Sequence, residues 1–75
     1  MQILLDSVIL IDHFNNISLA TEYLRRVRKE SAISVITRLE VLTGIPQSEW
    51  SEPIKFLNYF KCLPFTPAIA DHVAQ

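Results

Sequence analysis

The first fifteen residues, MQILLDSVILIDHFN at positions 1–15, contain the pattern that decides the fold. Residues 1–5 form a mainly apolar run that ends at Asp6, which is typical of a buried strand in a parallel sheet. Residues 7–15 then predict a helix, with Asp6 or Ser7 as its N-cap. The β-branched residues of this second segment would also suit a longer strand. A strand that passes directly into a helix predicts an α/β fold.

The rest of the chain continues this alternation. Strands are predicted at residues 32–36 and 62–65. Helices are predicted at residues 18–30, with Ser18 as the cap, and at 37–44, with Gly44 at the end. A further helix is predicted to begin at residue 48 or 51 and to end at 60, and another begins at 68. In the second helix the apolar stripe is Leu19, Tyr23 and Val27, widened by Ala20 and Leu24. The order β-α-α-β-α-α-β-α predicts one α/β domain around a short parallel sheet.

Composition and charge exclude several classes of protein. The 75 residues are 49% hydrophobic and 20% charged, which is a globular composition and not a disordered one. A net charge of −1 gives no global attraction to nucleic acid. One cysteine cannot form an internal disulfide, no Cys/His cluster has zinc spacing, and neither a signal peptide nor a membrane span is present. We therefore expect a cytoplasmic protein that does not insert into a membrane.

Two carboxylates are the candidate functional groups. Asp6 follows the first predicted strand, and Glu40 lies about one helical turn beyond the second. Ligands of α/β proteins gather at the carboxyl ends of the strands, so the two side chains can approach each other if the strands are neighbours. Hard oxygen ligands suit Mg²⁺ or Mn²⁺ better than zinc, and such an ion can activate water against a phosphodiester.

Each candidate also has a purely structural interpretation. Asp6 can simply cap the first helix, and Thr37-Arg38-Leu39-Glu40 matches a capping box in which Glu40 reaches back to the Thr37 backbone N–H. For the other candidates a structural role is also the more frequent one. A solvated position or a helix pair is expected for Asp12 with His13 and for Asp71 with His72. A solvated helix face is expected for the cations Arg25, Arg26, Arg28 and Lys29, and core or interface packing for the aromatic residues Trp50, Phe56, Tyr59 and Phe60.

Three segments resemble blocks of the PIN-domain ribonucleases, and of the VapC-type toxins in particular. They are LLDSVILID at residues 4–12, ISVITRLEVLTG at 33–44 and LPFTPAIAD at 63–71, and they occur in the family's order. The resemblance implies a three-layer PIN-like sandwich in which Asp6 and Glu40 coordinate Mg²⁺ or Mn²⁺, while Asp12 is not usually a ligand. Val8 departs from the polar residue often found two places after the first aspartate.

The resemblance also implies acidic residues and a further strand that follow the matched region in the family. Residues 1–75 are therefore expected to form a single incomplete PIN-like domain, with an incomplete metal site and little ribonuclease activity of its own. The partners implied are an RNA substrate and a cognate antitoxin protein. A homodimer is also expected, because the first strand would have an open edge. The alternative function is a non-catalytic binding module that keeps the surface for antitoxin docking or self-association.

Overall fold

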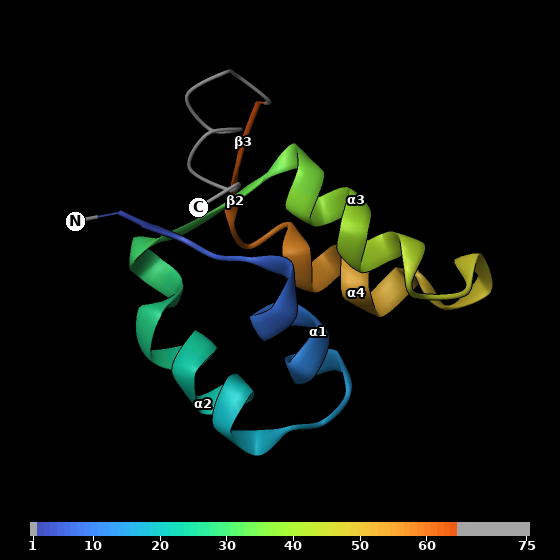
Figure 1. Cartoon of the computed structure of the whole chain (residues 1–75), viewed down its shortest axis with the longest axis horizontal. Helices are drawn as coiled ribbons and strands as arrows, with labels where there is room; N and C mark the ends of the chain where they lie inside the picture. The colour runs from blue at the N-terminus through green and yellow to red at the C-terminus, as the bar shows by residue number, and fades with distance from the viewer. Residues whose placement is uncertain (1, 65–75) are drawn as a thin grey trace.

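The computed structural model describes residues 2–64, which fold into a short parallel sheet with four α-helices (Figure 1). The order of elements is β1 (Ile3–Leu4), α1 (Ser7–Phe14), α2 (Ser18–Val27), β2 (Ser31–Ser34), α3 (Val35–Thr43), α4 (Ser51–Leu57) and β3 (Lys61–Leu63), with 3₁₀ turns at Arg28–Glu30 and Gln47–Glu49. The expected α/β class and parallel sheet are confirmed. The three-layer arrangement remains a prediction, and the helix expected from residue 68 lies outside the described residues.

The sheet has the strand order β1-β2-β3, with both neighbouring pairs parallel. Leu4 pairs with Ala32, and the Leu5 N–H donates to the Ala32 carbonyl at 2.9 Å, so the ladder continues one residue past β1. All four residues of β2 are buried, as expected for the middle strand. Because the strands are parallel, their carboxyl ends lie at one edge of the sheet and their amino ends at the other.

The sequence placed the start of the third helix incorrectly. Helix α3 begins at Val35 and not at Thr37, because Ser34 is its N-cap: the Ser34 hydroxyl accepts from the Thr37 N–H at 3.0 Å. The strand expected at 32–36 is correspondingly shifted to Ser31–Ser34. A local side-chain cap thus ends the strand, although the β-branched residues at 35–37 favour its continuation.

Other helix boundaries also differ from the expectation. Helix α2 ends at Val27, and a 3₁₀ turn covers the next three residues. The N-cap position of α2 is Ile17 and not Ser18. Gly44 ends α3 with a right-handed φ of −81°, so it is not a left-handed glycine cap. Helix α4 ends at Leu57, where the Trp50–Phe60 periodicity had predicted three more residues.

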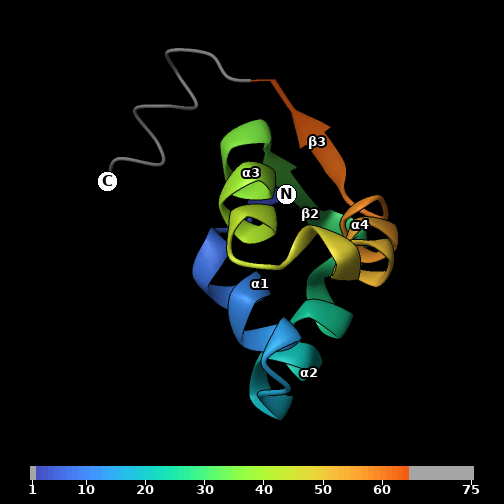
Figure 2. The ribbon, with the colours of Figure 1, turned by 90° about the vertical axis from the view of Figure 1, so that its right-hand side faces the viewer.

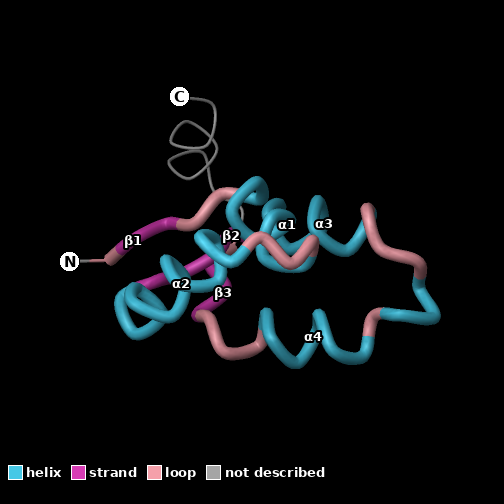
Figure 3. Tube along the Cα trace, turned by 90° about the horizontal axis from the view of Figure 1, so that it is seen from below, coloured by secondary structure: helices cyan, strands magenta, loops and turns pink. Residues whose placement is uncertain are grey.

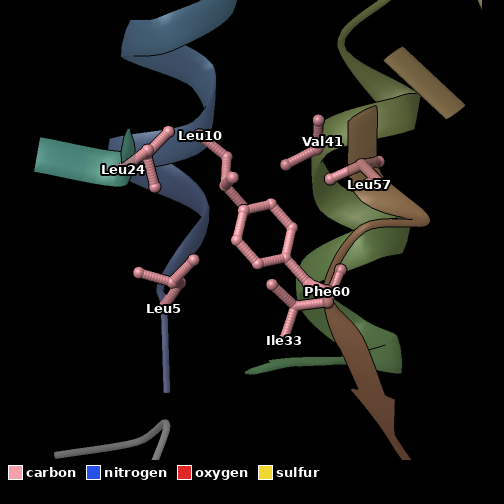
Figure 4. Close-up of a cluster of buried hydrophobic side chains, with 7 residues drawn as sticks. All are labelled: Leu5, Leu10, Leu24, Ile33, Val41, Leu57 and Phe60. Carbon is pink, nitrogen blue, oxygen red and sulfur yellow. The ribbon is translucent and has the colours of Figure 1, made fainter. Parts of the chain in front are cut away.

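The core lies where the helices meet the sheet. Seven buried side chains form its cluster: Leu5, Leu10, Leu24, Ile33, Val41, Leu57 and Phe60. Figure 4 shows the Phe60 ring in the middle of the cluster, between residues of α1 and α2 on one side and of α3 and α4 on the other. Every helix therefore contributes to one core, and Figures 2 and 3 show the helices grouped around the short strands.

One residue of the apolar stripe predicted for α2 lies on the solvent side. Ala20 and Leu24 are buried, whereas Leu19 is 75% exposed. Tyr23 and Val27 pack against the margin of the cluster. The helix is thus turned so that Leu24 points to the centre of the core and Leu19 points to solvent.

Candidate metal site at the carboxyl edge of the sheet

Asp6 and the start of α3 both lie at the carboxyl edge of the sheet. Leu4 pairs with Ala32 in neighbouring parallel strands, and Asp6 and Ser34 each follow two residues further along their own strand. Asp6 is the N-cap of α1, and Ser34 is the N-cap of α3. Helices α1 and α3 therefore leave the same edge of the sheet from neighbouring strands, and they contact each other (Figure 2).

Asp6 caps α1, as the sequence predicted. Its Oδ1 accepts a hydrogen bond from the Ile9 N–H at 3.2 Å. The carboxylate is exposed to solvent, and no hydrogen bond among residues 2–64 occupies Oδ2. The cap uses one of the four lone-pair sites of a carboxylate, so capping and coordination of a cation are compatible at this residue.

Glu40 does not take part in the capping box that its sequence suggested. The Thr37 N–H is already bound by Ser34, and Thr37 is the third residue of α3 and not its cap. Glu40 lies in the second turn of α3, exposed, with no hydrogen bond or ion pair from its side chain to the other described residues. The capping box, which was the structural interpretation of Glu40, is therefore excluded.

A buried hydroxyl pair lies between these two acids in the sequence. The Ser34 hydroxyl donates to the Thr37 Oγ1 at 3.1 Å, and both side chains are almost fully buried. Sequence reasoning missed Ser34, although serine is one of the preferred residues at the N-cap of a helix. The pair fixes the first turn of α3, from which Glu40 projects one turn later.

His13 has a structural environment and lies apart from this edge. Its Nδ1 is 2.8 Å from the Thr21 Oγ1, and its ring stacks on Phe56 with centroids 4.3 Å apart. It therefore joins α1 to α2 and α4, so the solvated position, one of the two structural interpretations offered by the sequence, does not hold. Burial lowers the pKa of the His13 imidazole below its ordinary value of 6.5.

This shift predicts how stability depends on pH. The unfolded chain takes up a proton on this histidine near pH 6.5, whereas the folded chain takes it up only at lower pH. Stability should thus be constant above about pH 6.5 and fall as the pH is lowered through the folded pKa. We expect the fall in Tm between about pH 7.5 and 5.5 to be smaller in His13→Gln than in the wild type. Equal falls in both proteins would contradict this account.

The remaining acidic and histidine candidates are Asp12 and the pair Asp71 and His72. Asp12 is half-buried on α1, and Val8, where the resemblance would have a polar residue, is a 62% exposed apolar side chain. Asp71 and His72 lie outside the described residues. Within residues 2–64, no three or more His, Cys, Asp or Glu side chains gather closely enough to hold a metal ion.

The Trp50 ring has a structural role. The Trp50 indole N–H donates to the carbonyls of Leu42 and Ile45, at 3.1 and 2.8 Å, so this ring secures the end of α3 and is not a base-stacking platform.

In the part of the chain that the structure describes, every helix is too short to cross a lipid bilayer.

Comparison with known proteins shows that the chain is similar to a ribonuclease. The chain is 36% identical over 70 residues to the ribonuclease VapC10 of Mycobacterium tuberculosis, in the strains CDC 1551 / Oshkosh and ATCC 25618 / H37Rv. The matched region covers 91% of this chain and 53% of the relative, so the chain spans about half the length of the curated relatives it matches. No family model matches the chain, and no solved structure matches it significantly.

Proposed function

Because 91% of this chain aligns with the ribonuclease VapC10 at 36% identity, we propose that it belongs to the VapC-type PIN ribonucleases and acts in metal-dependent cleavage of RNA, with Asp6 and Glu40 as ligands of Mg²⁺ or Mn²⁺. The observation that supports the proposal is the parallel pairing of β1 with β2, since Asp6 follows β1 and Ser34, the cap of the helix that holds Glu40, ends β2. Neighbouring parallel strands whose carboxyl ends carry acids are a frequent setting for a ligand site.

The packing of α1 on α3 supports the same pairing. Ile11 of α1 and Gly44 of α3 line one hollow between the two helices. Both helices run away from the same sheet edge, so one turn back on each leads from Ile11 to Ser7 and from Gly44 to Glu40. Asp6 immediately precedes Ser7, and we therefore expect the two carboxylates to face a common space.

The donor set fits a hard divalent cation in part. Both acids are exposed, and neither is neutralised by an ion pair among the described residues. Mg²⁺ keeps several waters and can be held by one or two carboxylates with substrate phosphate as a further ligand. When bound, the ion would supply positive charge for the scissile phosphate and lower the pKa of an attacking water. Asp6 and Glu40 would orient it, with Asp6 fixed by its bond to the Ile9 N–H.

The described residues supply two carboxylates to the proposed site, and such a pair holds an ion loosely, so we expect the 75-residue chain to cleave RNA slowly. Catalysis requires the ion to be positioned to within about half an ångström, which an incomplete ligand set does not provide. Slow activity is therefore part of the proposal, and its test depends on a comparison of variants and not on the absolute rate.

The test is cleavage of a generic single-stranded RNA with Mg²⁺ or Mn²⁺. We expect slow, metal-dependent cleavage that falls to background in Asp6→Asn and in Glu40→Gln, and is unchanged in Asp12→Asn. The Asp6→Asn change is well matched, because asparagine caps a helix as well as aspartate does. Cleavage that persists in either of the first two variants, or that is lost equally in Asp12→Asn, would contradict the assignment.

A second candidate function is a non-catalytic module that binds an antitoxin protein or a second copy of this chain. The observation in its favour is the exposure of large apolar side chains on the same two helices: Val8 is 62% and Leu39 is 58% exposed. It predicts dimers in sedimentation at tens of micromolar (about the range in which weak association is visible). A monomer at that concentration would contradict the self-association form of this proposal.

A further inference from the structure

The amino edge of the sheet, opposite the Asp6 edge, carries a basic hollow. Its lining comes from four separate parts of the chain: Gln2 before β1, the 3₁₀ turn Arg28–Glu30 with Ser31, Tyr59 after α4, and Lys61 at the start of β3. Figure 3 shows the beginnings of the three strands on the same side of the sheet. The fold thus collects residues that the sequence keeps up to 59 positions apart.

The charge of this hollow is opposite to that of the whole chain. Three cations, Arg28, Lys29 and Lys61, line it together with the single carboxylate of Glu30, whereas the chain has a net charge of −1. Within residues 2–64 the one ion pair joins Lys55 to Glu52, so none of the three cations is neutralised there. A local cluster of this kind attracts anions even on an acidic protein.

An exposed aromatic ring accompanies the cations. Tyr59 is 68% exposed, and the Arg28 guanidinium lies 5.4 Å from the centre of its ring. This cation–π contact holds one side of the ring and joins the 3₁₀ turn to the loop before β3. Cations combined with an exposed aromatic ring are the features with which proteins bind single-stranded nucleic acid, through phosphate contacts and base stacking.

The 3₁₀ turn explains why helical periodicity in the sequence does not identify this surface. A continuous helix through residues 18–30 would keep Arg28 and Lys29 on the solvated face with Arg25 and Arg26. The structure instead ends α2 at Val27, where the Ser31 hydroxyl donates to the Val27 carbonyl at 2.7 Å. Arg28 and Lys29 are thereby placed at the sheet edge next to Lys61.

We propose that the hollow lined by Arg28, Lys29, Tyr59 and Lys61 is a binding subsite for single-stranded RNA, separate from the Asp6–Glu40 edge. Lys29 and Lys61 contact phosphates, and a base stacks on Tyr59. The proposal rests on the proposed ribonuclease function only for the choice of RNA as the anion. The subsite contributes affinity and takes no part in the cleavage step.

The test measures binding of a fluorescently labelled single-stranded RNA of mixed sequence by anisotropy, in EDTA so that cleavage cannot occur. The test variant combines Lys29→Gln with Lys61→Gln. Its matched control combines Arg26→Gln with Lys55→Gln, which removes the same charge from exposed positions that do not line the hollow. Circular dichroism of both variants verifies that they fold.

We expect the test variant to bind RNA more weakly and to lower the slope of log K against log salt by roughly 1.4, at about 0.7 for each phosphate of a single strand that is no longer neutralised. The control should change neither quantity. Tyr59→Ala should weaken binding at least about fivefold with the salt slope unchanged, and Tyr59→Phe should restore it, because stacking needs only the ring.

Three results would overturn the proposal. They are the absence of saturable RNA binding by the wild type at low salt, equal reductions of affinity in the test and control variants, and competition by polyglutamate as effective as that by unlabelled RNA of equal charge. The last result would assign the hollow to acidic protein segments. Because all arms are run in EDTA, failure here leaves the metal-site proposal standing, and failure of metal binding leaves this one standing.

Discussion

The Phe60→Ala substitution should leave a large fraction of the protein molecules unfolded. The Phe60 side chain is 5% exposed, lies at the centre of the cluster in Figure 4 and meets the Phe56 ring edge-on at 5.4 Å. Truncation of a buried phenylalanine costs about 3–5 kcal/mol of unfolding free energy. A domain of this length has only about 4–11 kcal/mol in total, at 0.05–0.15 kcal/mol per residue. The measurement is urea denaturation followed by circular dichroism.

The adjacent tyrosine provides a matched control for this experiment. Tyr59 is also aromatic and follows the same helix, but it is 68% exposed. Its replacement by alanine removes the cation–π interaction with Arg28, so we expect the unfolding free energy to fall by less than about 1 kcal/mol. Similar destabilisation of the two variants, or a fall below about 1 kcal/mol for Phe60→Ala, would show that the core is not organised around Phe60.

The order of elements through β3 was predictable from the sequence because each strand is a short apolar run followed by a helical period. The boundaries were less predictable, since they depend on single hydrogen bonds. Ser34 ends β2 by binding the Thr37 N–H, and Ser31 binds the Val27 carbonyl where α2 ends. Apolar periodicity does not register such hydrogen bonds, so it extended both elements too far.

The rotation of α2 was similarly beyond the sequence pattern. The predicted stripe contained Leu19, Tyr23 and Val27 with Ala20 and Leu24, and it did not show which of these residues lies at its centre. Ala20 and Leu24 are the buried pair, whereas Leu19 is exposed. The neighbours of the helix decide this, because Leu24 packs in one cluster with Leu10 of α1.

The candidate site illustrates the same division. That Asp6 ends a strand and caps a helix was predictable from its position, and the bond to the Ile9 N–H confirms the cap. The capping box assigned to Glu40 was wrong, because Ser34 already occupies the Thr37 N–H. The basic hollow could not be predicted, since Lys61 joins Arg28 and Lys29 only through the pairing of β3 with β2.

The second large effect concerns metal binding. If Asp6 and Glu40 hold one ion together, each single substitution removes half of the protein ligands. We expect Asp6→Asn and Glu40→Gln each to weaken Mn²⁺ binding by roughly 10- to 100-fold. Asparagine keeps the cap of α1, and Glu40 has no structural partner among the described residues, so folding should be unaffected.

A double variant separates a shared site from two independent ones. Ligands of one ion are strongly coupled, so the combined variant should bind Mn²⁺ scarcely more weakly than the worse of the two single variants. Two independent surface carboxylates would each bind an ion of their own, so each single variant would lose one site and keep the other at unchanged affinity. Asp12→Asn provides the control, since it removes one acid from the same helix.

The most direct test of this account is therefore a titration with Mn²⁺, followed by the electron paramagnetic resonance signal of the free ion. The wild type and Asp12→Asn, Asp6→Asn, Glu40→Gln and the Asp6/Glu40 double variant are compared. The account predicts one site of equal affinity in the first two proteins and its coupled loss in the other three. Equal Mn²⁺ binding by all five proteins, or two sites in the wild type of which each single variant keeps one at unchanged affinity, would contradict it.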